Sequence, residues 1–108
     1  MYIMSGALHD FIMDQRREAE EFSKKPGCFM GMMPAPTETK YWSERVPSGT
    51  LEEYKRIELE ESAYYLAADA MSKSYARMIS PKLSDMTNDQ LVDFCAQMSI
   101  LMKADEVA

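Results

Sequence analysis

The segment that most constrains the fold is residues 50–79, which has the apolar spacing of one long helix. Thr50 and Glu53 have the spacing of a capping box, in which each side chain binds a free backbone N–H of the first turn. Pro81 is expected to end the helix, because a proline clashes with the preceding turn. One stripe recurs at alternating spacings of three and four: Tyr54, Ile57, Glu61, Tyr64, Ala68, Met71, Tyr75 and Met78.

Two further helices are predicted, over residues 5–24 and 87–103. Ser5 is a suitable N-cap for the first, and Pro26 and Gly27 stop it. Thr87 and Gln90 form a second capping box at the start of the last helix. The predicted apolar faces are Leu8, Phe11, Ile12, Ala19 and Phe22 in the first helix, and Leu91, Phe94, Cys95, Met98, Leu101 and Met102 in the last.

Residues 26–49 show neither a helical nor a strand period, so they are predicted to form an irregular loop. Their many apolar side chains argue against disorder, and the loop should pack on the helices, on a partner, or on both. The predicted fold is therefore all-α. It is a three-helix bundle in a single domain, residues 1–108, with the helix of residues 50–79 central.

Composition excludes several classes of function. The chain has 12 Lys and Arg against 18 Asp and Glu, a net charge of −6, so no cationic patch is available to bind nucleic acid. No apolar run approaches the roughly 20 residues that span a membrane. The first residues lack the plan of a signal peptide, and two cysteines are too few for a disulfide framework. We expect a cytoplasmic protein with reduced thiols.

Candidate catalytic groups are sparse. His9 is the one histidine, which is too few for a zinc site or a di-iron bundle. Cys28 begins a run of soft donors, continued by Met30, Met32 and Met33, that could suit Cu(I). A hydrophobic role is favoured for this run, as core filler or binding surface, because softness alone is a weak signal. We therefore predict no enzyme activity, no metal and no cofactor, and a metal or enzyme role using Glu61 and Cys28 is the remote alternative.

Tyr41, Trp42 and Arg45 belong to the residue types most enriched at interface hot spots. Trp42 could equally anchor the loop to the helices, as lone tryptophans in small domains commonly do. We predict a non-enzymatic protein–protein interaction module, an inhibitor, adaptor or assembly factor of the kind that phages encode. Its partner would bind the loop and the adjoining acidic face of the long helix. The predicted partner-binding residues are Phe29, Met30, Met32, Met33, Tyr41, Trp42 and Arg45.

Glu61 interrupts the apolar stripe, and a buried carboxylate is costly unless it is paired. We favour a position at the wet edge of the stripe over a polar pin in a dimer seam. The alternative function is a structural or regulatory homo-oligomer, a dimer through the long helix. Its subunit seam would contain Glu61, Tyr64, Met71 and Tyr75.

Overall fold

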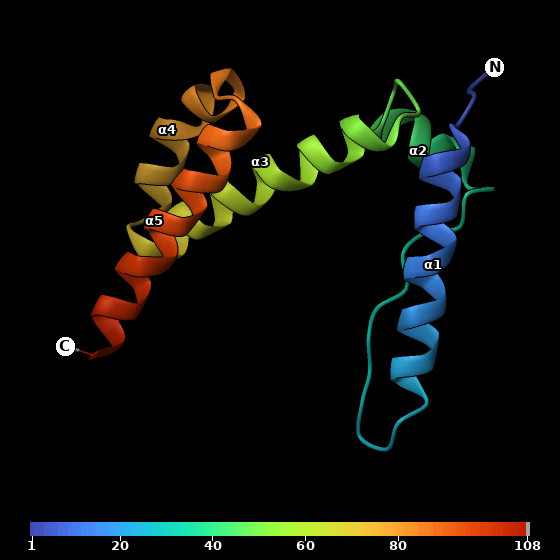
Figure 1. Ribbon diagram of the computed structural model, residues 1–108, viewed down its shortest axis with the longest axis horizontal. Coiled ribbons are helices and arrows are strands. Elements are labelled where there is room, and N and C mark those ends of the chain that lie inside the picture. The colour runs from blue at the N-terminus through green and yellow to red at the C-terminus, as the bar shows by residue number, and fades with distance from the viewer. Residues whose placement is uncertain (108) are drawn as a thin grey trace. The chain divides into compact units, whose positions relative to one another are not determined.

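A computed structural model describes residues 1–107, with side chains to residue 104. Across these residues the structure has helices and no strand, which confirms the all-α class (Figure 1). The predicted three helices are five in the structure. They form two compact units, Met1–Tyr54 and Lys55–Ala108, so the unit boundary falls within α3. The helices are α1 (Gly6–Ser23), α2 (Thr39–Arg45), α3 (Leu51–Ala70), α4 (Lys73–Asp85) and α5 (Asn88–Val107).

The prediction of one helix over residues 50–79 is wrong, because the chain breaks after Ala70. Ser72 is extended, with φ −170°, and its hydroxyl accepts a 3.0 Å hydrogen bond from the backbone N–H of Tyr75. Serine competes for backbone groups in this way and so starts a new helix. The three–four spacing of apolar residues continues across the break. The period alone therefore cannot report it.

Pro81 does not end a helix as predicted but lies inside α4, which continues to Asp85. A proline leaves the carbonyl four residues earlier, that of Arg77, without a helical donor. Pro81 and Arg77 are both exposed, so water can satisfy that carbonyl. The local cost is thereby reduced, and the contacts of α4 with its neighbours decide the outcome.

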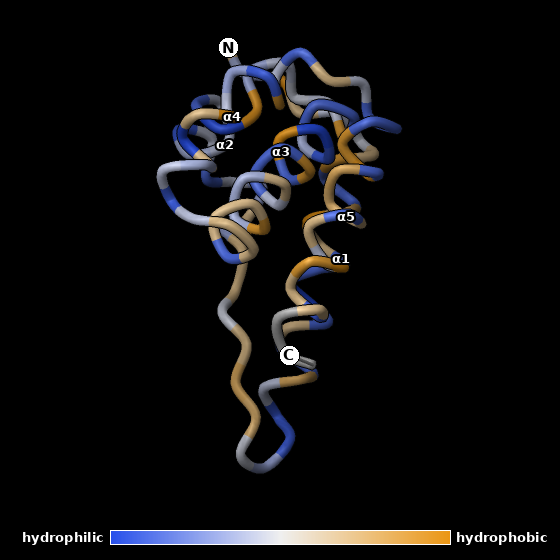
Figure 2. Tube along the Cα trace, turned by 90° about the vertical axis from the view of Figure 1, so that its left-hand side faces the viewer, coloured by the Kyte–Doolittle hydropathy of each residue, from blue (hydrophilic) through white to orange (hydrophobic). Residues whose placement is uncertain are grey.

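The first unit is built from α1, a returning segment and α2. The hydroxyl of Ser5 caps α1, accepting from the backbone N–H of Leu8. Beyond α1 the chain turns back and runs beside it to α2, as Figures 1 and 2 both show. The predicted irregular loop of residues 26–49 thus ends in a helix. Its seven residues bury one side chain, Trp42, too few to create a readable period.

Aromatic rings fill the core of this unit together with Leu8 and Ile12 of α1. Trp42 is 1% exposed, and its Nε1 donates a 2.9 Å hydrogen bond to the carbonyl of Ala35. Its ring lies 5.9 Å from that of Tyr54, which lies 5.4 Å from the ring of Phe11, measured between centroids. Such tilted pairs stabilise beyond the area they bury.

The N-terminal segment is fixed to the turn before α3. The backbone N–H of Ser5 donates to the carbonyl of Gly49 at 2.8 Å, and the hydroxyl of Tyr2 donates to the carbonyl of Val46 at 2.9 Å. Burial, with nearby Glu53 as the lesser cause, raises the pKa of Tyr2. Gly49 has φ +70°, and a Cβ there would lie 2.2 Å from the carbonyl oxygen of Ile3.

We predict that Gly49→Ala destabilises the first unit by about 2–4 kcal/mol, since it adds a backbone clash to left-handed strain. Gly27 has φ +74° in open space, so Gly27→Ala isolates the strain and should cost about 1 kcal/mol. Gly31→Ala meets no neighbour within 4 Å and serves as the control. Urea denaturation followed by circular dichroism ranks the three. Equal midpoints for Gly49→Ala and Gly31→Ala would contradict the prediction.

The second unit packs α4 and α5 against the rest of α3. Small side chains at the contacts, Ala63, Ala67 and Ala76, let the helices approach closely. The predicted capping box of α5 is confirmed: Gln90 N–H donates to the Thr87 hydroxyl at 3.2 Å, and Thr87 N–H donates to the Gln90 side-chain oxygen at 2.9 Å. The buried cluster is Ala63, Ala67, Ala76, Leu83, Leu91, Phe94 and Met98.

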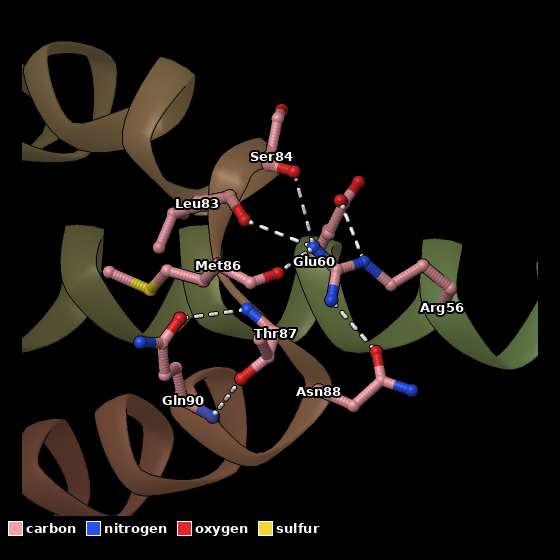
Figure 3. Close-up of polar contacts among 8 residues, drawn as sticks. All are labelled: Arg56, Glu60, Leu83, Ser84, Met86, Thr87, Asn88 and Gln90. Carbon is pink, nitrogen blue, oxygen red and sulfur yellow. Dashed lines mark hydrogen bonds and ion pairs between the residues drawn. The ribbon is translucent and has the colours of Figure 1, made fainter.

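Arg56 of α3 holds the turn that joins α4 to α5 (Figure 3). Its Nη2 donates to the carbonyls of Leu83 and Ser84, each at 3.3 Å, and to that of Met86. These carbonyls lie at the end of α4, where a helix lacks internal donors and favours a cation. The remaining nitrogens engage side chains, Nη1 with Asn88 Oδ1 at 2.8 Å and Nε with Glu60 Oε1 at 2.9 Å.

We predict that Arg56→Met, which keeps an apolar stem, destabilises the second unit by about 2 kcal/mol, because several carbonyls lose a charged donor. Arg56→Lys should recover less than half of this loss, since one ammonium cannot reproduce the planar fork. Lys55→Met, at an exposed neighbouring position, is the matched control. Chemical denaturation measures all three, and a lysine variant as stable as the parent would rule out the fork geometry as the cause.

Candidate partner-binding surface

The structure leaves much of the predicted partner-binding set on the outside of the first unit. Phe29 is 85% exposed, and Met30, Met32 and Tyr41 are each more than 40% exposed. Hydrophobic colouring follows the returning segment that carries the first three (Figure 2). We call Phe29, Met30, Met32, Met33 and Tyr41 the loop surface.

A hollow of about 440 Å³ opens within this surface. It brings together three predicted residues, Met32, Met33 and Tyr41, from the returning segment and α2. Arg16 and Glu38 contribute a cation and an anion to its wall. Sequence reasoning missed both, because Arg16 reaches this site from the polar side of α1, and helical periodicity does not show what such a residue contacts.

Hydrogen bonds fix the main chain around the hollow. The guanidinium of Arg16 donates to the carbonyl of Met33. The backbone N–H of Met30 donates to the hydroxyl of Ser23 at 3.1 Å, which ties the segment to the end of α1. On the other side, the indole of Trp42 holds Ala35. The apolar side chains of the loop surface are therefore presented on a backbone with defined partners.

Trp42 and Arg45 differ from the other predicted residues. The Trp42 ring is buried, and its contacts with Ala35 and Tyr54 support the anchoring role that was the alternative. Arg45 is half-buried at the end of α2. A buried ring cannot meet a partner directly, so Trp42 acts on the loop surface by positioning Tyr41, whose ring meets it edge-on at 4.9 Å.

The four predicted seam residues all lie in the second unit but do not share one helix. Glu61 and Tyr64 are half-buried and line a hollow of about 360 Å³. Tyr75 is half-buried on α4 and packs against the buried cluster, as Tyr64 does. Met71 follows α3 and is exposed. The break at Ser72 thus separates residues that the sequence places on a single stripe.

Groups that could support catalysis or bind a metal are dispersed. Over the part of the chain that the structure describes, His, Cys, Asp and Glu nowhere gather in threes. His9 Nδ1 lies 3.3 Å from an oxygen of Asp10 on the exposed side of α1. Burial raises the pKa of the Cys95 thiol, which disfavours the reactive thiolate at neutral pH. None of the helices described is both long and apolar enough to cross a membrane.

Comparison with protein-family models, curated proteins and solved structures finds no match to this chain. The functional argument therefore rests on the residues and contacts described above.

Proposed function

We propose that this chain is a protein–protein interaction module that binds its partner through the loop surface of the first unit. The observation that carries the proposal is a set of large apolar side chains held outward by a hydrogen-bonded backbone. Exposed apolar area costs about 25 cal/mol per Å² relative to burial. A contiguous patch of this kind is typical of a binding site.

The hollow favours an apolar anchor from the partner. Met32, Met33 and Tyr41 provide flexible and aromatic walls, and methionine adapts to irregular shapes. Arg16 and Glu38 can orient polar groups around that anchor. The net charge of −6 favours a partner with a basic surface, through faster encounter. An inhibitor, adaptor or assembly factor fits this chemistry.

The acidic helix face that the sequence joins to the loop is divided between the two units. Glu52 and Glu53 lie in the first unit, whereas Glu58, Glu60 and Glu61 lie in the second. Glu53 is already engaged, since its Oε1 accepts from the backbone N–H and the hydroxyl of Ser48, at 2.9 Å each. The proposal therefore keeps to the loop surface.

We predict that Phe29→Ala, Met32→Ala and Tyr41→Ala each weaken partner binding by about 1–2 kcal/mol, roughly 5- to 30-fold. These side chains are exposed, so the variants should fold normally. Met13→Ala, which truncates an exposed methionine of α1, is the matched control. Quantitative pull-downs from the native lysate identify proteins retained by parent and control but depleted by the three variants. A partner retained equally by all five chains would place its site elsewhere.

A homo-oligomer is the second candidate, and exposed apolar side chains of the second unit favour it. Val92 and Ile100 lie two turns apart on α5 and are each more than half exposed, as are Met71 and Met78. Of the predicted seam, Met71 alone is exposed. This candidate predicts a concentration-dependent mass above 12.4 kDa in sedimentation equilibrium, reduced by Ile100→Lys. A constant mass of 12.4 kDa would exclude it.

A further inference from the structure

The second unit carries a hollow that the proposed function does not use. It lies between α3 and α4 and has a volume of about 360 Å³. Adjacent carboxylates, Glu60 and Glu61, are each followed one turn later by a tyrosine, Tyr64 and Tyr65. Positions four apart lie on the same side of a helix, so each carboxylate neighbours a ring. Leu83 and Ser84 of α4 contribute to the opposite wall.

The charge of the hollow is negative. None of its lining residues is basic, and two are glutamates. Arg56 Nε binds Oε1 of Glu60 at 2.9 Å, while its other nitrogens donate to Asn88 and to backbone carbonyls. One guanidinium thus stands beside two carboxylates. The site favours a cation by charge complementarity.

The aromatic rings make the same selection by a different interaction. Tyr64 and Tyr65 meet edge to face, with centroids 5.6 Å apart. Tyr65 is 63% exposed, so a ligand can reach it. The face of an aromatic ring attracts a cation, and rings combined with carboxylates are the chemistry of ammonium recognition. Leu83 adds an apolar wall suited to methylene groups.

We infer that this hollow binds an alkylammonium group, with Glu61 as the charge partner, Tyr65 as the cation–π surface and Leu83 against the alkyl chain. The inference is independent of the loop surface, because every residue that it uses belongs to the second unit. It also gives a role to the carboxylate that interrupts the apolar stripe.

The test is an NMR titration of the full chain with n-butylammonium, with 1-butanol as the neutral match. Saturable shifts at residues 60–65 and 83–84 are expected for the cation alone. Glu61→Gln should weaken the affinity about fivefold and Tyr65→Leu about threefold, since each removes one attraction. Asp93→Asn removes a carboxylate from a different hollow and should change nothing. Amide spectra of the variants establish that they remain folded.

A second arm separates the sources of the ammonium group. Nα-acetyl-lysine N-methylamide represents a lysine of a protein, and putrescine represents a free diamine. Tighter binding of the lysine derivative assigns the hollow to a partner's side chain, and tighter binding of putrescine assigns it to a small molecule. Both results support ammonium recognition. Equal shifts with 1-butanol and n-butylammonium would overturn it, as would unchanged affinity in both Glu61→Gln and Tyr65→Leu.

Discussion

The second unit depends on Arg56, whose one side chain satisfies the end of α4 and the start of α5 together. Carbonyls at a helix end need donors, and a turn between two helices supplies few of them. The Arg56 guanidinium reaches these carbonyls from α3, and Asn88 in the first turn of α5 accepts from the same group. A single α3 residue therefore sets where α4 stops and where α5 begins. The buried cluster then packs between helices whose ends are already fixed.

The same division between fixed ends and packed faces explains what the sequence could predict. Caps are local, so those at Ser5 and Thr87 were found correctly, and Thr50 does accept from the backbone N–H of Glu53 at 3.2 Å. The return contact of that capping box was wrong, because Glu53 binds Ser48 instead. Periodicity failed at Ser72, where the chain breaks without interrupting the apolar spacing. The hydrogen bonds of Arg56 span up to 32 residues, and no local pattern indicates them.

The candidate surface was predictable in composition but not in shape. Phe29, Met32 and Tyr41 were identified because apolar residues in an irregular segment need a role. Their grouping around one hollow needs the contacts of Arg16 and Trp42, which join segments 17 and 7 residues apart to the same loop. Trp42 shows the limit most clearly, since hot-spot composition and an anchoring role give the same sequence signal.

The burial of Trp42 also gives the molecule an internal reporter. It is the one tryptophan of the chain, and it lies in the first unit, whereas helix is distributed over both. Indole fluorescence therefore follows the melting of one half, while helical ellipticity follows the whole. Coincident transitions would mean that the two halves unfold cooperatively, and separate transitions would mean that each is its own folding unit. One native side chain thus suffices to measure how far α3 couples them.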